Sequence, residues 1–125
     1  MKKIYFPLLI VFVATLTACG SNFEWFPKVA DTTGPTVSAT VGGKTFTNST
    51  TYHSTIPPAT SVTLSGTDIT SVPVTIYYTT NGSAPTTSFT TYTAPIQITD
   101  YWALRFFGKD SVGNQSSPIT LTFAN

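Results

Sequence analysis

The residue types that carry enzyme chemistry are scarce in this 125-residue chain. It has one histidine and one cysteine, and 9% of its residues are charged. His53 has no cysteine or second histidine beside it, so it fits a loop histidine better than a metal ligand or a general base. The five carboxylates, at positions 24, 31, 68, 100 and 110, form no paired motif, and no nucleophile elbow, phosphate loop or zinc-binding spacing occurs. We therefore expect no enzyme, no cofactor and no metal site. Binding of calcium by Asp31, Asp68 and Asp110, brought together at one end of the fold, stays an alternative because calcium prefers oxygen ligands.

The single cysteine, Cys19, follows a segment with the order of a secretory signal. Two lysines precede an apolar run over residues 4–13, which is too short to span a bilayer stably, and small residues come after it. Residues 16–19 read Leu-Thr-Ala-Cys, which resembles the lipobox of bacterial lipoproteins. The resemblance implies cleavage before Cys19, a diacylglycerol on its sulfur, and usually an acyl chain on the new amine. We therefore expect a signal peptide over residues 1–18 and a membrane anchor at Cys19.

The expected location is the cell envelope. Gly20 is not the aspartate that retains lipoproteins at the inner membrane of enteric bacteria, so the resemblance implies the outer membrane in a diderm. In a monoderm it implies the outer face of the plasma membrane. Without the signal peptide, four basic residues face five acidic ones and the net charge is −1. We expect no nucleic-acid partner, because such binding depends on positive charge.

The remaining chain divides into a tether and one domain. Residues 19–34 have neither a helical period nor alternation, and we expect a tether in which Phe23, Trp25 and Phe26 fit either the lipid headgroup layer or a lid on the domain. Residues 35–125 contain short alternating runs separated by Gly, Pro and Asn turns. The predicted strands cover residues 36–41, 45–47, 62–65, 74–79, 96–98, 102–109 and 119–123. They predict an all-β fold: an immunoglobulin-like or fibronectin III-like antiparallel β-sandwich of about seven strands, without a disulfide.

Three segments of the predicted domain carry a second resemblance. Residues 76–86 read IYYTTNGSAPT, residues 92–96 read YTAPI, and residues 104–116 read LRFFGKDSVGNQS. In this order they resemble the chitobiase/β-hexosaminidase C-terminal domain. That β-sandwich is appended to fucosidases of family 29 and occurs in many bacterial envelope proteins. The resemblance covers residues 35–125 and implies a domain without catalytic residues of its own.

The motif residues are expected to be structural. We expect two tight turns, with Asp110 accepting hydrogen bonds from backbone N–H groups of the second. Two residues depart from the family's pattern: Asn81 stands in place of an aspartate, and Gly108 in place of an alanine, which leaves a smaller core contact. The predicted turn residues are Asn81, Gly82, Ser83, Asp110, Gly113 and Asn114.

One face of the sandwich is a candidate binding surface. If Ile76 and Leu104 point inward, Tyr77, Arg105 and Phe107 point outward together. An exposed aromatic pair beside an arginine suits a sugar ring or a protein partner, and it equally suits a pair that only stabilises the sheet. The expected function is that of a membrane-anchored envelope lipoprotein whose sandwich is a non-catalytic binding or assembly module for an unidentified envelope protein or glycan. The alternative is a carbohydrate-binding lipoprotein, accessory to glycan degradation or cell-wall attachment.

Overall fold

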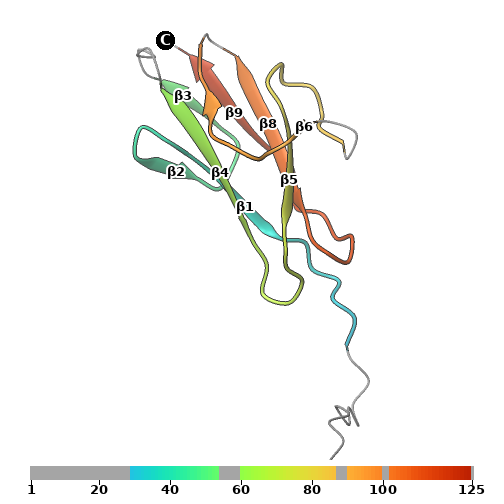
Figure 1. Ribbon diagram of the computed structural model, residues 1–125. Coiled ribbons are helices and arrows are strands. Elements are labelled where there is room, and N and C mark those ends of the chain that lie inside the picture. The colour runs from blue at the N-terminus through green and yellow to red at the C-terminus, as the bar shows by residue number, and fades with distance from the viewer. Residues whose placement is uncertain (1–28, 54–59, 87–89, 100–101, 125) are drawn as a thin grey trace, which may run out of the picture.

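The computed structural model describes residues 29–53, 60–86, 90–99 and 102–124, and its regular elements there are all strands (Figure 1). One sheet has the order β2-β1-β4-β7 and the other the order β3-β9-β8-β5-β6. The predicted all-β sandwich is confirmed. None of the described residues belongs to a helix long and apolar enough to cross a membrane. The strands are β1 (Thr36–Val41), β2 (Lys44–Phe46), β3 (Thr50–His53), β4 (Ser61–Thr67), β5 (Thr75–Thr79), β6 (Thr90–Thr91), β7 (Ile96–Gln97), β8 (Ala103–Lys109) and β9 (Ile119–Ala124).

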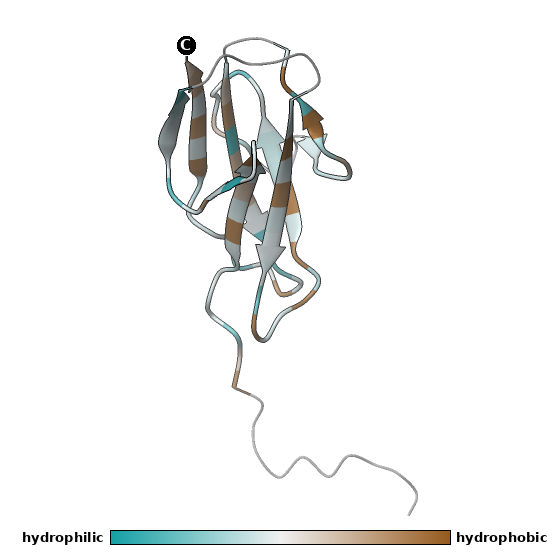
Figure 2. Ribbon diagram, turned by 90° about the vertical axis from the view of Figure 1, so that its left-hand side faces the viewer, coloured by the Kyte–Doolittle hydropathy of each residue, from teal (hydrophilic) through white to brown (hydrophobic). Residues whose placement is uncertain are grey.

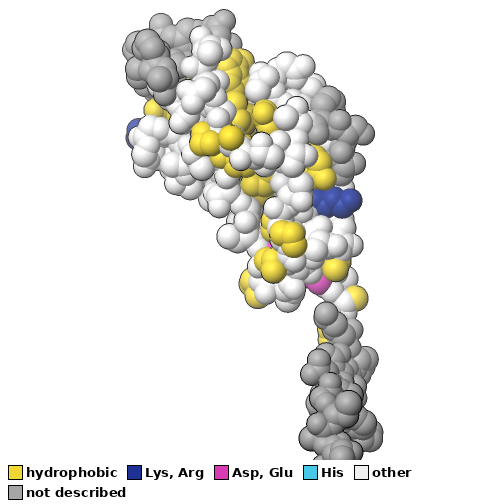
Figure 3. Space-filling view, viewed as in Figure 1, with side chains coloured by type: hydrophobic (Ala, Val, Ile, Leu, Met, Phe, Trp, Pro, Cys, Tyr) yellow, Lys and Arg dark blue, Asp and Glu magenta, His cyan; other side chains and the backbone are white. Residues whose placement is uncertain are grey.

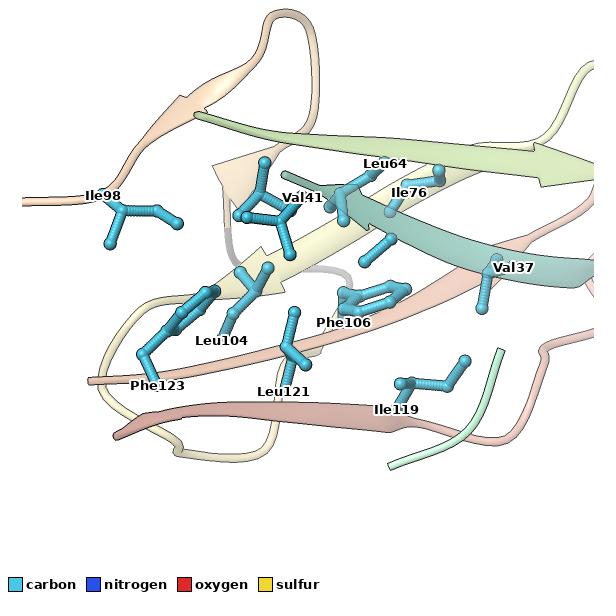
Figure 4. Close-up of a cluster of buried hydrophobic side chains, with 12 residues drawn as sticks. Val37, Val41, Leu64, Ile76, Ile98, Leu104, Phe106, Ile119, Leu121 and Phe123 are labelled. Atoms are coloured by element: carbon cyan, nitrogen blue, oxygen red, sulfur yellow. The ribbon is translucent and has the colours of Figure 1, made fainter. Parts of the chain in front are cut away.

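The core lies between the sheets and follows from the alternation of apolar residues. Successive strand side chains point to opposite faces, so every second residue of β1, β4 and β9 points inward. Figure 2 shows the resulting hydrophobic bands along the strands, and Figure 4 shows the side chains meeting between them. Burying one such large side chain contributes about 1.5–3 kcal/mol. The core residues are Val37, Ala39, Val41, Val62, Leu64, Ile76, Ile98, Leu104, Phe106, Ile119, Leu121 and Phe123.

The two sheets are tightly packed around Gly108. A Cβ at this position would lie 2.6 Å from Val37 Cγ1, and 3.1 Å from both Pro35 Cγ and Val74 Cγ1. The space that an alanine would occupy is therefore already filled by side chains of β1 and of the segments next to β1 and β5. The expectation that Gly108 leaves a smaller core contact is wrong, because these neighbouring side chains supply that contact.

Several strands differ from the sequence prediction. Strands β3 and β6 were not expected, and β3 runs parallel to β9 in a sandwich that is otherwise antiparallel. His53, expected in a loop, is the exposed last residue of β3. Gly66, which lies just beyond the strand predicted over residues 62–65, lies inside β4 and pairs with Val37. β3 has no apolar alternation to reveal it, since its sequence is Thr-Thr-Tyr-His.

Three segments meet at the end of the sandwich from which the N-terminal chain leaves (Figure 1). We call this the N-terminal end, and it comprises residues 29–35, the β4–β5 loop (68–74) and the β8–β9 loop (110–118). Asn114 Nδ2 donates a hydrogen bond to the carbonyl oxygen of Asp31 at 3.0 Å. Residues 31–34, assigned to the tether from the sequence, thus include a segment held against the domain.

Candidate functional site

The outward face of the β5–β8 pair carries the predicted aromatic pair. Tyr77 pairs with Phe107 in the register of the two strands. Their rings stack, with centroids 5.4 Å apart and planes inclined by 22°. Phe107 is only 3% exposed although it lies outside the main core. The prediction that both rings are exposed is therefore wrong for Phe107, which is buried and stacks on the ring of its cross-strand neighbour.

Arg105 lies on the same face of β8, two residues before Phe107. Its register partners are Thr79 on β5 and Thr120 on β9. The residue is half-buried, and its Nε is buried without a hydrogen-bond partner among the described residues. Burying an unpaired donor is unfavourable, so this Nε is a cost to the fold rather than a group that a ligand can reach from solvent.

A shallow hollow of about 350 Å³ lies beside Tyr77 at the other end of the pair. Its lining includes Thr75, Lys109 and the start of the β8–β9 loop. Thr75 and Lys109 are opposite each other in the strand register. Neither residue was predicted as a site residue from the sequence, although their alternation with Tyr77 and Phe107 places them on the same face. The hollow combines an aromatic ring, a hydroxyl and an ammonium group, and such groups suit a small polar ligand such as a sugar.

The first motif turn follows β5 and is held by local hydrogen bonds. Asn81 Oδ1 accepts hydrogen bonds from the backbone N–H of Ser83 at 3.0 Å and from its hydroxyl at 2.7 Å. Gly82 has a φ of 76°, which glycine adopts without strain, and its N–H donates to the carbonyl oxygen of Ala103. The side-chain oxygen of Asn81 is therefore used inside the turn.

The second motif turn is organised by Asp110, which is 6% exposed. Its Oδ1 accepts three backbone N–H groups, from Val112 at 3.0 Å, Gly113 at 2.6 Å and Asn114 at 2.8 Å. Its Oδ2 accepts the side-chain amide of Asn114 at 2.8 Å. Burial alone raises the pKa of Asp110, but these four hydrogen bonds outweigh it and hold the pKa below its usual value.

Three carboxylates converge at the N-terminal end. Asp31, Asp68 and Asp110 each have an oxygen within 4.8 Å of the others. Asp68 Oδ1 accepts the N–H of Thr70 at 2.9 Å and that of Ser71 at 2.8 Å. The Asp68 carboxylate is therefore bonded within its own loop, as that of Asp110 is.

Asp31 is bonded within its own segment through one carboxylate oxygen. Its Oδ1 accepts the N–H and the hydroxyl of Thr33, whereas its Oδ2 is buried without a hydrogen-bond partner. The nearby hydroxyl groups of Ser71 and Thr70, together with Thr33, hold the pKa of Asp31 well below its usual value. The cluster thus has the oxygen chemistry that a hard cation prefers, the arrangement that the sequence left open as an alternative.

The comparison with known families covers most of the sandwich. The family model of the chitobiase/beta-hexosaminidase C-terminal domain matches residues 47–120. The chain belongs to this family. The match spans β3 to β8 and includes both motif turns, but it begins after the β1–β2 hairpin, where the sequence resemblance had been placed from residue 35. No curated protein and no solved structure gives a significant match.

The chitobiase C-terminal-like domain brings few reactive side chains together. Within the described ranges, the three aspartates form the one group of three potential metal ligands, and His53 is not part of it. Cys19 and the three tether aromatics Phe23, Trp25 and Phe26 lie outside the described residues. Their roles therefore stay predictions from the sequence.

Proposed function

We propose that this protein is a cell-envelope lipoprotein, anchored through lipid on Cys19, whose single sandwich is a non-catalytic binding or assembly module. The observation that carries the proposal is Leu-Thr-Ala-Cys at residues 16–19, directly behind a short apolar run with two lysines before it. Membership of a family of β-sandwich modules supports the second half, because modules of this kind accompany carbohydrate-active enzymes.

Lipid on Cys19 holds the domain close to the membrane. Two or three acyl chains, at about 0.8 kcal/mol for each buried methylene, give a stable anchor. The domain begins in practice at Asp31, where the chain is bonded to Asn114. A twelve-residue segment reaches at most about 40 Å when fully extended. The sandwich therefore works within that distance of the bilayer surface.

The absence of catalysis is part of the proposal. Asp110 and Asp68 use carboxylate oxygens to accept backbone N–H groups of their own loops, and Arg105 on the outer face has threonines as its register partners on both neighbouring strands. His53 is exposed at the end of β3. Such groups support a folded module better than a general acid–base pair, which needs two groups within reach of one substrate.

Metabolic labelling with palmitate in the native host tests the anchor. We expect label in the wild type and in Ser21→Ala, which keeps the cysteine, and no label in Cys19→Ala. The envelope membrane fraction of the native host should contain the labelled protein. Equal labelling of all three proteins, or of none of them, would contradict the proposal.

Carbohydrate binding is the second candidate function. The observation that favours it is the hollow beside Tyr77, with Thr75 and Lys109 in its lining. We expect Tyr77→Ala to weaken co-sedimentation of the protein with chitin or peptidoglycan severalfold. Thr63→Ala, an exposed change on the other sheet, is the matched control. If the wild type sediments with neither polymer, a protein partner is favoured instead.

A further inference from the structure

The large hydrophobic side chains that are exposed in the described part of the chain all lie at the N-terminal end. Ile69 is fully exposed, and Val29, Val72 and Val112 are 90%, 67% and 63% exposed. They come from three separate segments: the N-terminal chain, the β4–β5 loop and the β8–β9 loop. Figure 3 shows hydrophobic side chains on the surface at this end, beside the point where the N-terminal chain leaves.

These segments are joined to one another beneath their apolar tips. Carboxylate oxygens of Asp31, Asp68 and Asp110, one residue from each segment, lie within 4.8 Å of one another. Asn114 also binds the carbonyl oxygen of Asp31 across two of the segments. The acidic groups are half-buried or buried and bonded within their loops, whereas the valines and the isoleucine project into solvent. This end therefore presents apolar tips outside a layer of three carboxylates that each bind N–H groups of their own segment.

The chain path indicates what covers these tips. Val29 follows Cys19 by ten residues, so an extended chain puts it within about 35 Å of the lipid-bearing residue. The C-terminus lies at the opposite end of the sandwich (Figure 1). Apolar side chains on exposed loops insert into the boundary between headgroups and acyl chains when a tether keeps them there.

We infer that the N-terminal end of the sandwich docks on the phospholipid surface that anchors Cys19, with Ile69, Val72 and Val112 inserted at the interface. The inference rests on the proposed lipid anchor. It sets the orientation of the domain: the C-terminal end and His53 point away from the bilayer, and the outer face with Tyr77 stands at its side, open to envelope partners.

Fluorescent labelling of the full lipidated protein in phosphatidylcholine vesicles tests the inference. Cys19 is the single cysteine of the chain, and lipidation blocks its thiol, so an introduced cysteine takes an environment-sensitive dye selectively. The test variants are Ile69→Cys and Val112→Cys. His53→Cys, exposed at the opposite end, is the matched control. The readouts are the emission maximum and quenching by nitroxide-labelled lipid.

We expect blue-shifted emission and severalfold stronger quenching by nitroxide lipid at positions 69 and 112 than at position 53. A further variant, Ile69→Ser with Val72→Ser, should lower the quenching at position 112 while leaving thermal unfolding unchanged, because both side chains are exposed. Equal quenching at both ends, with lipid confirmed on Cys19, would overturn the orientation and leave the anchor intact. Protection of positions 69 and 112 from water without lipid quenching would overturn it in favour of a second protein copy. An unmodified Cys19 would overturn both the anchor and the inference.

Discussion

Replacing Gly108 by alanine tests how the two sheets fit together. The new Cβ would lie 2.6 Å from Val37 Cγ1, and 3.1 Å from side chains on two further residues, all of them apolar and packed. Overpacking of this kind costs about 1–3 kcal/mol. Alanine recovers about 0.5–1 kcal/mol relative to glycine in a strand, because glycine loses more backbone entropy on folding. The difference between these two ranges is an expected net loss of up to about 2.5 kcal/mol.

A matched partner variant separates this clash from a general intolerance of Gly108 to change. Val37→Ala removes the methyl group that the new Cβ would meet, and on its own costs about 2–3 kcal/mol through lost burial and a cavity. Together the two changes should cost at least about 0.5 kcal/mol less than the sum of the single changes, because the alanine then fills the space that the valine leaves.

Urea unfolding followed by tryptophan fluorescence measures these differences. For a domain of this size, a loss of 1 kcal/mol lowers the thermal midpoint by about 4–8 °C, which gives a second readout. Strict additivity of the two changes, or a gain in stability from Gly108→Ala alone, would refute the account of how closely the sheets approach at this point.

Three further predictions follow from the described contacts. Phe107→Ala should lower the free energy of unfolding in urea by about 3–5 kcal/mol, because the ring is buried. Tyr77→Ala should lower it clearly less, because its ring is half-exposed. Equal, small losses in the two variants would contradict the burial of Phe107. The pKa values of Asp31 and Asp110 are lowered in the folded state, so their stabilising effect is present above the unfolded value near 4 and is lost as the pH falls toward the folded values. The free energy of unfolding should therefore fall between pH 5 and pH 2 (approximate limits taken from that unfolded value), less steeply in Asp31→Asn, and an unchanged slope in that variant would be evidence against its lowered pKa. The expectation of no bound metal predicts the same thermal midpoint in chelator and in calcium; a calcium-dependent rise that Asp68→Asn abolishes would contradict it and assign a cation to the three-aspartate cluster.

The strands with alternating apolar residues were predictable, and those without them were not. β1, β8 and β9 place every second residue in the core, and a period of two reveals this directly. β3 contains one large apolar ring, that of Tyr52, whose centroid lies 5.9 Å from those of both Phe46 and Phe123. This strand forms because it pairs with β9 and because Tyr52 packs on distant rings, so the local sequence pattern does not predict it.

The sequence predicts the face of the sheet on which the candidate site lies, but not how deeply its side chains are buried. Alternation correctly placed Tyr77, Arg105 and Phe107 on one face, since the core residues of β5 and β8 point the other way. The Phe107 ring stacks on that of Tyr77, which lies 30 residues away in the sequence, so a local pattern does not show this contact. The convergence of the acidic residues likewise depends on loops brought together by the sandwich, so the sequence left it as an alternative.

Mass spectrometry of the N-terminal peptide from the membrane fraction tests the central claim most directly. The account predicts a mature chain that begins at Cys19, with the mass of a diacylglycerol on its sulfur and of an acyl chain on its amine. Cys19 recovered with a free thiol, whether residues 1–18 are retained or removed elsewhere, would contradict it.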